Sequence, residues 1–316
     1  MLKNARDTSV QLPALDSQAA LVYDSLVQQT QHAVQQAGYQ ELLLGLSGGL
    51  DSALVATVAV DALALMGLPS SNLHAAIMPS QWTSAQSIID ANEIVARLQI
   101  QSCILDIMPA YTTISDTLQP VFDPVPAVDF PDKTQENIQA RIRAVLLMAL
   151  SNKFDRLVLA TSNFSEISVG YTTLYGDSIG AFAPLAAVYK SWAFELTAFR
   201  NQRALEQGNV TPIPSSVLDK EPSAELAPGQ TDAAALGSYC QLDALLYALQ
   251  NGREKPSGFT QFEDLGFDKD YVVEIANRVA KSRYKQQQAC PGAMLPDEVL
   301  NSVRQQFEQQ IQNRKV

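Results

Sequence analysis

Residues 45–52 read Gly-Leu-Ser-Gly-Gly-Leu-Asp-Ser, a combination of residue types suited to holding a phosphate group. An apolar run at 41–44 comes directly before this glycine turn, and an apolar helical stretch at 53–65 directly after it. A strand, a glycine-rich turn and a helix in this order aim backbone N–H groups and a helix N-terminus at an anion. The serine and the two glycines at 47–49 are expected to form the floor, because glycine lets a bulky phosphate approach the backbone.

Asp51 is the unusual member of the glycine turn. A carboxylate repels phosphate unless a divalent cation lies between them, so Asp51 indicates Mg²⁺. The turn lacks the lysine that ends the Gly-x-x-x-x-Gly-Lys-Ser/Thr nucleotide loop. The alternative is an ordinary tight turn whose helix is capped by Ser47 or Asp51.

Residues 136–143 read Glu-Asn-Ile-Gln-Ala-Arg-Ile-Arg and lead into an apolar run. Asn137 and Arg141 are four positions apart and are expected to share a helix face, with Arg143 directed elsewhere. An amide beside a guanidinium suits a ligand that has hydrogen-bonding edges and an anionic group. Taken alone, the stretch is more simply explained as a solvated helix face.

A second polar segment begins with Thr161, at the end of a predicted strand, and ends with Asp177. Glu166 is expected one turn into the next helix, where it would supply a second Mg²⁺ ligand opposite the first carboxylate. Asp177 offers a fixed hydrogen-bond acceptor. The alternative makes Ser162 or Asn163 a helix cap and Asp177 a turn residue.

Lys190 follows an apolar run and opens a predicted helix, from which its ammonium group can reach a phosphate as a point charge. Solubility is the ordinary explanation for one such lysine considered alone. The segment 221–232, Glu-Pro-Ser-Ala-Glu-Leu-Ala-Pro-Gly-Gln-Thr-Asp, shows by composition only a mobile polar loop.

The elements that must position these residues alternate between two types. Apolar runs that predict buried strands lie at 41–44, 73–78, 103–107 and 157–160. Helical spacing of apolar residues lies between and before them, at 16–36, 53–65, 84–98 and 134–151. This alternation predicts an α/β fold with a doubly wound parallel sheet and ligands at the carboxyl ends of its strands.

Beyond residue 183 the pattern is mostly helical, at 189–207, 232–250 and 268–287. The proline-dotted stretch between the first two is long enough to be a lid or a binding loop. With 316 residues and 47% hydrophobic content, the chain can bury one large α/β core with appended helices.

Charge and composition exclude several classes of protein. A net charge of −11 argues against general nucleic-acid binding, so any cations that hold a polyanion must be few and local. No segment approaches the ~20 apolar residues of a membrane span, and no basic-then-apolar signal opens the chain, so a cytoplasmic protein is expected. Cys103, Cys240 and Cys290 are too far apart for a disulfide framework or a Cys-x-x-Cys metal site.

The glycine turn resembles the pyrophosphate loop of the ATP pyrophosphatases, which cut ATP between its α and β phosphates. Over residues 18–292 the chain resembles the NAD⁺ synthetase family, and within it the synthetase domain of the glutamine-dependent enzymes. The matching segments are Leu-Ser-Gly-Gly-Leu-Asp-Ser (46–52), Met-Pro-Ser (78–80), 136–143, 165–177 and 222–232.

This resemblance implies an adenine nucleotide α-hydrolase-like, Rossmann-like fold with extra C-terminal helices. It divides the chain into a flexible leader at 1–16, a synthetase domain at 17–292 and a helical tail at 293–316. The implied reaction has two steps. The nicotinate carboxylate of deamido-NAD⁺ (nicotinic acid adenine dinucleotide) attacks the α-phosphate of ATP, and ammonia then attacks the adenylate to give NAD⁺ and AMP, with Mg²⁺ as the cofactor.

The resemblance also implies roles for single residues. Asp51 and Glu166 would bind Mg²⁺, and Asp51 and Lys190 would be catalytic. ATP would be held by Leu46, Ser47, Gly48, Gly49, Ser52, Met78, Gln81, Thr161 and Lys190. Deamido-NAD⁺ would be held by Asn137, Arg141, Tyr171, Asp177 and Lys285. A lid at 215–231 would order when substrates bind and exclude water from the adenylate, with functional residues Ser223, Glu225, Gln230 and Asp232.

The family implies a homodimer whose dinucleotide site spans the interface. Its glutamine-dependent members carry an N-terminal amidase domain with a Glu-Lys-Cys triad, whereas only a short leader without cysteine precedes residue 18 here. This chain is therefore expected to use free ammonia or to receive it from a separate glutaminase chain, unless it is a fragment of a longer protein.

The chain departs from the family pattern at basic positions. Gln81, Phe164, Gln286 and Gln287 stand where close relatives carry arginine or lysine. Weaker ATP binding, a changed substrate or replacement by other lysines are the possible results. The rival interpretations are another amide-forming ATP pyrophosphatase and a nucleotide-binding module that has lost catalysis.

Overall fold

The computed structural model describes residues 10–123, 132–251, 262 and 265–314. Within these residues, four parallel strands form one sheet in the order β3-β2-β1-β4. The strands are β1 (Leu42–Gly45), β2 (Leu73–Ile77), β3 (Gln101–Ile104) and β4 (Leu157–Val158). Because β4 pairs with β1 on the side away from β2, the chain reverses its winding direction between β1 and β4. That reversal is where doubly wound sheets bind ligands, and the predicted α/β architecture is confirmed.

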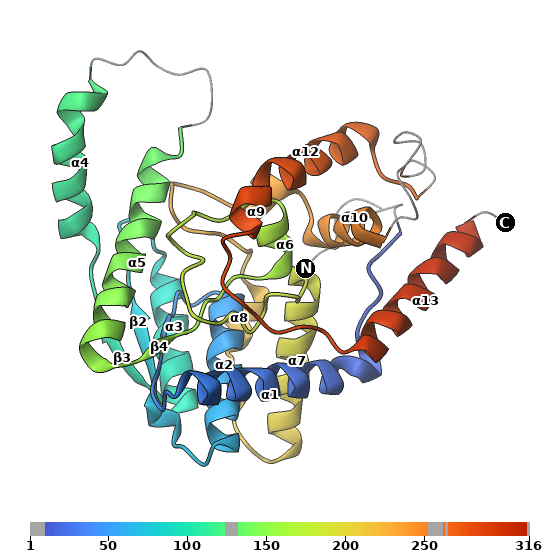
Figure 1. The fold of residues 1–316 in the computed structure, drawn as a ribbon, viewed down its shortest axis with the longest axis horizontal. Coiled ribbons are helices and arrows are strands. Elements are labelled where there is room, and N and C mark those ends of the chain that lie inside the picture. Colours follow the sequence, from blue (N-terminus) through green and yellow to red (C-terminus); the bar gives the residue numbers. More distant parts are fainter. Residues whose placement is uncertain (1–9, 124–131, 252–261, 263–264, 315–316) are drawn as a thin grey trace.

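Alternate residues of the strands point into two helical layers. Leu42 and Leu44 belong to the larger core cluster, whereas Leu43 between them belongs to a second cluster on the opposite face. The larger cluster is covered by α1 (Ala19–Ala37), α2 (Leu50–Leu65), α3 (Ala85–Leu98) and α7 (Lys190–Glu206). The other face is covered by α4 (Met108–Phe122) and α5 (Thr134–Phe154), which stand side by side in Figure 1.

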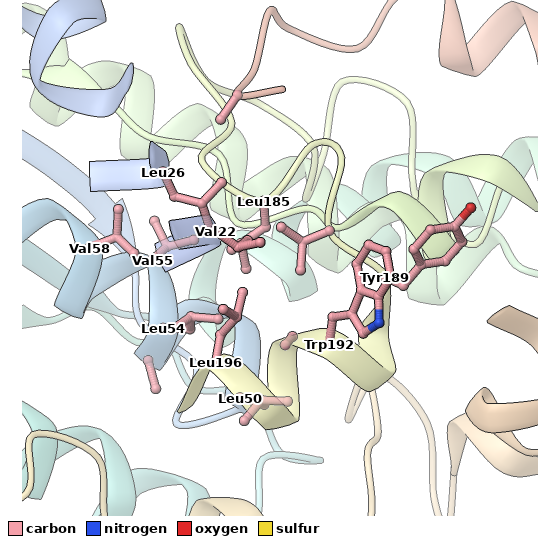
Figure 2. Close-up of a cluster of buried hydrophobic side chains, with 14 of the residues drawn as sticks. Val22, Leu26, Leu50, Leu54, Val55, Val58, Leu185, Tyr189, Trp192 and Leu196 are labelled. Atoms are coloured by element: carbon pink, nitrogen blue, oxygen red, sulfur yellow. The ribbon is translucent and has the colours of Figure 1, made fainter. Parts of the chain in front are cut away.

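The centre of the larger core lies where α1, α2 and α7 meet. Figure 2 shows side chains from the three helices closing on one another, among them Val22, Leu26, Leu54, Val55, Trp192 and Leu196. Burying each large side chain of this kind contributes about 1.5–3 kcal/mol. Helix α2 is apolar on all sides, as expected of a helix enclosed by its neighbours, and its first turn carries the end of the glycine turn.

The C-terminal helices extend this core on the right of Figure 1. They are α10 (Tyr239–Asn251), α12 (Lys269–Gln286) and α13 (Asp297–Arg314). Short helices connect the layers: α6 (Phe164–Ser168), α8 (Ser215–Asp219), α9 (Asp232–Leu236) and the 3₁₀ turns η1 (Asp16–Gln18) and η2 (Ser70–Asn72). No helix in the described part of the chain is long and apolar enough to cross a membrane.

Several predicted elements need correction. The strand predicted at 103–107 begins earlier, as β3, and its residues are exposed, at the edge of the sheet beside β2. Helix α4 was not predicted. The helix predicted at 232–250 is two helices, α9 and α10, because Gly237 between them has φ +77°.

Both ends of the chain contribute to the core where they are described. In the leader, Val10 and Leu15 are buried, and the Leu15 N–H donates to Glu195 Oε2 at 2.7 Å, so residues 10–16 are packed. In the tail, Phe307 is buried and its ring centroid lies 4.9 Å from that of Tyr247. Residues 1–9 of the predicted leader and 315–316 of the tail lie outside the described residues.

Candidate active site

A cavity of about 510 Å³ opens at the carboxyl ends of β1, β2 and β4. Its volume falls within the roughly 300–1,000 Å³ common for small-molecule sites. The segments that follow these strands contribute Ser47, Met78 and Thr161 to its wall. Helices α5 and α7, the lid segment (residues 215–231), α6, the 171–177 turn and Lys285 of α12 contribute further polar lining. The cavity therefore lies at the sheet edge where the sequence predicts ligand binding.

Hydroxyl groups hold the shape of the glycine turn. The Ser47 N–H donates to Ser52 Oγ at 3.2 Å, and the two serine hydroxyl oxygens are 3.1 Å apart. The Gly49 N–H donates to Ser47 Oγ at 3.2 Å. The Leu46 N–H donates to the Ala76 carbonyl at 3.0 Å and so ties the start of the turn to β2.

Gly48 is required by conformation and by a close contact. Its φ is +75°, and a Cβ at this position would lie 2.1 Å from the carbonyl oxygen of Ser87 in α3. Among the described residues, Gly48 does not line the cavity. The close contact that requires a glycine at position 48 is thus with helix α3 of the protein itself.

We expect Gly48→Ala to destabilise the protein by more than Gly67→Ala. Both glycines have positive φ, but a Cβ on Gly67 would meet no atom within 4 Å. Gly67→Ala should cost about 1–2 kcal/mol for the left-handed conformation alone. Gly48→Ala adds the clash with Ser87 and should cost at least about 2 kcal/mol more. Urea unfolding of the two variants measures the difference, and equal losses would show that α3 does not restrict the turn.

A buried lysine connects the two carboxylates that were expected to bind Mg²⁺. Lys190 Nζ donates to Asp51 Oδ2 and, at 3.0 Å, to Glu166 Oε1. Only 5% of the Lys190 side chain is exposed, so the contact is shielded from water. Burial lowers the pKa of Lys190, but Asp51 and Glu166 outweigh it and hold the pKa above its ordinary value. Lys190 is therefore charged, and its single positive charge is shared between the two carboxylates.

Burial raises the pKa of Asp51 to about 6, against the opposing effect of Lys190. Asn163 Nδ2 also donates to Asp51 Oδ1 at 3.2 Å, and the Asn163 side chain caps α6 by accepting from the Glu166 N–H. Asn163 thereby fits the helix-cap alternative and at the same time holds the Asp51 carboxylate and the backbone of Glu166.

These carboxylates suit Mg²⁺ that arrives with a nucleotide. The described residues contain no group of three or more His, Cys, Asp or Glu side chains placed to hold a metal ion. Mg²⁺ commonly binds through one or two carboxylates together with substrate phosphates. Asp51 and Glu166 both line the cavity and share a cation, which matches that donor set.

Tyr239 joins this cluster and was not predicted. Its hydroxyl lies 3.1 Å from Glu166 Oε1 and 2.8 Å from Asp232 Oδ2. The Tyr171 hydroxyl donates to the other oxygen of Asp232 at 3.1 Å. Asp232 follows the lid segment directly, so Tyr239 links the end of the lid to a predicted metal ligand. One tyrosine within an apolar helical run gives no sequence signal for this role.

Four of the five residues predicted to bind deamido-NAD⁺ line the cavity: Asn137, Tyr171, Asp177 and Lys285. Both oxygens of Asp177 are already engaged, one by the Thr173 N–H at 2.7 Å and the other by Thr172 Oγ1 at 2.8 Å. These hydrogen bonds are those of a turn residue, the role that the alternative interpretation gives to Asp177. Lys285 Nζ donates to the Gly170 and Thr172 carbonyls at 2.8 and 2.6 Å and so braces the same turn.

The two arginines of α5 are arranged opposite to the prediction. Arg143 lines the cavity, where its Nε donates to the Met78 carbonyl at 3.0 Å and burial lowers its pKa to about 10. Arg141 is exposed, and its Nε donates to the Leu174 carbonyl at 3.2 Å. The cavity face of α5 passes from Asn137 through Ala140 to Arg143, a spacing of three, which also keeps residues on one face.

The lid segment lies across the cavity and is bonded to both sides. Glu225 accepts from Ser87 Oγ of α3 at 2.7 Å and from the Ser84 N–H at 3.3 Å. Gln230 Nε2 donates to Glu136 Oε2 of α5 at 3.0 Å, while its backbone carbonyl accepts from Ser223 Oγ at 2.6 Å. The four residues predicted to serve the lid therefore hold its shape or attach it to neighbouring elements.

Lys220 of the lid brings an unpredicted cation to the glycine turn. Its Nζ donates to the Gly48 carbonyl and to Ser87 Oγ, both at 2.9 Å. Among the described residues, the cations that line the cavity are Lys133, Arg143, Lys190, Lys220 and Lys285. The same lining carries seven carboxylates, so these few cations do not give the site an excess of positive charge.

The positions at which the family pattern was expected to carry basic residues lie elsewhere. Gln81 is exposed, and neither it nor Phe164 nor Gln286 lines the cavity within the described structure. Phe164 packs its ring 4.8 Å from that of Tyr189, and Gln286 Nε2 donates to the Ser168 carbonyl at 2.8 Å.

Comparison with known proteins gives a consistent result. The model of the family described as NAD synthase matches residues 22–289. The glutamine-dependent NAD(+) synthetase of Acinetobacter baylyi is 41% identical over 292 residues, which are 92% of this chain and 51% of that protein. The chain thus spans about half the length of the curated relatives it matches.

Two solved structures match along nearly their whole length. The NH3-dependent NAD synthetase of Campylobacter jejuni has a TM-score of 0.64 at 27% identity, over 84% of this chain and 95% of that one. The NMN synthetase of Francisella tularensis has a TM-score of 0.67 at 27% identity, over 88% of this chain and 98% of that one. The family model matches well over half of the chain, and the chain therefore belongs to the NAD synthase family.

Proposed function

We propose that the chain is a ligase that converts deamido-NAD⁺ into NAD⁺, with ATP as co-substrate and ammonia as nitrogen donor. The reaction would pass through an adenylated carboxylate and release pyrophosphate and AMP. The observation that carries the proposal is the pair of carboxylates, Asp51 and Glu166, that share a buried cation beside the glycine turn. An ordinary turn does not require two carboxylates around a buried cation. This arrangement suits a nucleotide that binds together with a metal ion.

In this scheme, Ser47, Gly49 and Ser52 present N–H and hydroxyl donors to the pyrophosphate end of ATP. Lys190 and Lys220 offset the charge that builds on the phosphates as the bond between the α-phosphorus and the oxygen that bridges it to the β-phosphate breaks. Asp51 and Glu166 would hold Mg²⁺, which would supply positive charge that stabilises the leaving pyrophosphate.

The acid substrate would enter at the other end of the cavity. Asn137 and Arg143 point into it from α5, and Lys285 and Asp177 hold the 172–177 turn beside them. Holding the nicotinate carboxylate near the α-phosphate converts a reaction between two molecules into one within a single complex. The lid would then keep water from the adenylate until ammonia arrives.

Formation of NAD⁺ tests the proposal. The purified chain is given Mg-ATP, deamido-NAD⁺ and either ammonium or glutamine. We expect NAD⁺, AMP and pyrophosphate in equal amounts with ammonium, and no NAD⁺ with glutamine alone. Product from glutamine alone would contradict the ammonia assignment, and a chain that binds ATP without releasing pyrophosphate would be the binding module of the rival interpretation.

A second candidate is amidation of a mononucleotide, which the similarity to the Francisella tularensis NMN synthetase favours. The same assay distinguishes the two candidates when nicotinic acid mononucleotide replaces deamido-NAD⁺. A higher kcat/KM for the mononucleotide would assign the chain to that reaction.

We also propose that the chain forms a two-fold dimer through α4 and α5. Val145 and Met148 are 69% and 36% exposed and share a helix face with Arg141, four and seven positions earlier. Ile114 and Val121 of α4 are likewise exposed apolar residues. An interface on this face would bring the exposed Arg141 next to the partner, in agreement with a dinucleotide site that spans two subunits.

Val145→Asp is expected to convert the dimer into a monomer. A carboxylate in an apolar interface loses hydration without gaining a partner, which costs about 1–3 kcal/mol per subunit or more. Light scattering after size-exclusion chromatography measures the mass, and Val210→Asp is the control, since Val210 is equally exposed at 72% but lies beyond α7. A monomeric wild-type protein would contradict the proposal.

A further inference from the structure

Asp243 of α10 is a fully buried carboxylate that does not line the main cavity. Its Oδ1 accepts from Ser165 Oγ at 2.5 Å, and its Oδ2 accepts from the Ser191 N–H at 2.8 Å. These donors are a hydroxyl and a backbone amide, whereas a lysine or arginine is the common partner of a buried carboxylate. Burial raises the pKa of Asp243 to about 6, so keeping it charged has a cost that its neighbours must offset.

The first neighbour is the start of α7. This helix begins at Lys190, and the residue before it, Tyr189, provides no side-chain cap. The N–H groups of the first turn need acceptors, and they receive them from other helices. Asp243 accepts from Ser191, and Ser165 Oγ accepts from the Lys190 N–H at 2.9 Å. The negative charge of Asp243 also lies at the positive end of the α7 dipole.

The second neighbour is α6. Ser165 lies directly before Glu166, and its hydroxyl donates to Asp243 while it accepts from the backbone of Lys190. Together with Ser165, Asp243 thereby links the α6 segment that carries Glu166 to the first turn of α7, which carries Lys190. The side chains of Lys190 and Glu166 meet at 3.0 Å on the cavity side of this link.

Apolar packing already joins the three helices, because Trp192 of α7 and Leu246 of α10 belong to one core cluster, against which Phe164 of α6 packs. Packing tolerates small shifts, whereas short hydrogen bonds to a fixed acceptor do not. The buried charge of Asp243 therefore contributes more to fixing the relative positions of α6 and α7 than to the stability of the fold.

We propose that Asp243 is a positioning residue that sets the spacing between Lys190 and Glu166, and through Lys190 the position of Asp51. The inference rests on the proposed function, since it assigns Asp243 to the arrangement of the Mg-nucleotide site. Asp243 touches neither substrate nor metal and acts only through Ser165 and the first turn of α7.

Asp243→Asn keeps the shape of the side chain but turns an NH₂ group toward one of the two donors. We expect kcat to fall about 10–100-fold, the usual effect of removing a residue that orients metal ligands. The Mg²⁺ concentration for half-maximal rate should rise about 10-fold or more. KM for deamido-NAD⁺ should change less than about 3-fold, because the acid end of the cavity is built by α5 and the 172–177 turn.

Asp61→Asn is the matched control. Asp61 anchors the same helix α7 through Arg200, at 2.7 and 3.0 Å, but near its other end. Its loss weakens α7 without moving the start of that helix. Ser165→Ala removes the shared hydroxyl, and in the proposal its effect on kcat is not additive with that of Asp243→Asn, because both break one link.

A binding measurement separates this inference from the proposed reaction. Isothermal titration of Mn²⁺ in the presence of α,β-methylene-ATP should give an affinity about 10-fold weaker for Asp243→Asn than for the wild type and Asp61→Asn. If the wild type binds Mn²⁺ and nucleotide but forms no NAD⁺, the proposed reaction is wrong and the binding comparison still decides the role of Asp243. If Asp243→Asn only unfolds at lower temperature, with wild-type Mn²⁺ affinity and wild-type turnover per folded molecule, the inference is overturned. Should Asp243→Asn fail to fold, Ser165→Ala in the same measurements decides in its place.

Discussion

Replacing Asp51 by Asn is expected to lower the rate of pyrophosphate release about 1,000-fold, equivalent to about 4 kcal/mol of transition-state stabilisation. The amide keeps the size of the side chain and can still accept from Asn163, so the fold should persist. It cannot provide the charge that a divalent cation needs between protein and triphosphate. Pyrophosphate release with Mg-ATP and deamido-NAD⁺ measures the loss, and circular dichroism checks the fold.

The result must be separated from an effect on Lys190, which donates to Asp51. A titration with Mg²⁺ makes the separation, because a lost metal ligand shifts the Mg²⁺ dependence whereas a displaced lysine lowers the rate at every Mg²⁺ concentration. Near-normal turnover in Asp51→Asn would remove the metal role of Asp51, and the proposed mechanism with it.

Lys190→Met should lower kcat by about 100–1,000-fold, the range found when one group that stabilises developing charge is removed. It should also reduce the free energy of unfolding by about 3–5 kcal/mol, because Asp51 and Glu166 would then lack their buried counterion. Methionine fills nearly the same volume, so loss of packing is a small part of the effect.

The stability loss in Lys190→Met has its own internal test. Addition of Mg²⁺ with a nonhydrolysable ATP analogue should restore part of the lost stability, since a new cation then faces the carboxylates. Arg203→Met provides a control, because Arg203 also pairs with an aspartate, Asp24, but at the surface, where such pairs contribute about 0–1 kcal/mol. If both lysine and arginine variants lose the same small amount of stability, Lys190 is not the counterion of the site.

The architecture could be predicted from the sequence because the strands carry a strong local signal. Runs such as 41–44 and 73–78 are apolar and short, and the segments between them have helical spacing. The edge strand β3 was placed too late, because Gln101 and Ser102 are polar and form part of the strand only by pairing with β2. Helix α4 was not predicted although Tyr111, Ile114 and Leu118 follow helical spacing; it contains Pro120, a residue type that ordinarily interrupts a helix.

Candidate site residues in the glycine turn could be predicted because they are adjacent in the chain and their order has a chemical meaning. Tyr239 and Lys220 could not, because each reaches the site from a distant helix or from the lid, and single polar residues of this kind are common at surfaces. Arg143 was assigned to the wrong face because the four-residue spacing of Asn137 and Arg141 was used without the three-residue spacing through Ala140.

The ammonium group of Lys190 lies between two acids deep inside the protein, and this gives the chain a built-in counterion. A site that depended wholly on an imported ion for neutrality would loosen whenever that ion was removed. Here a chelator should empty the pocket and leave the surrounding helices in place, so that folding and loading are separate events. A metal ion that binds must then compete with the Lys190 ammonium group for the two carboxylates. This competition favours an ion that binds together with the nucleotide over one that binds alone.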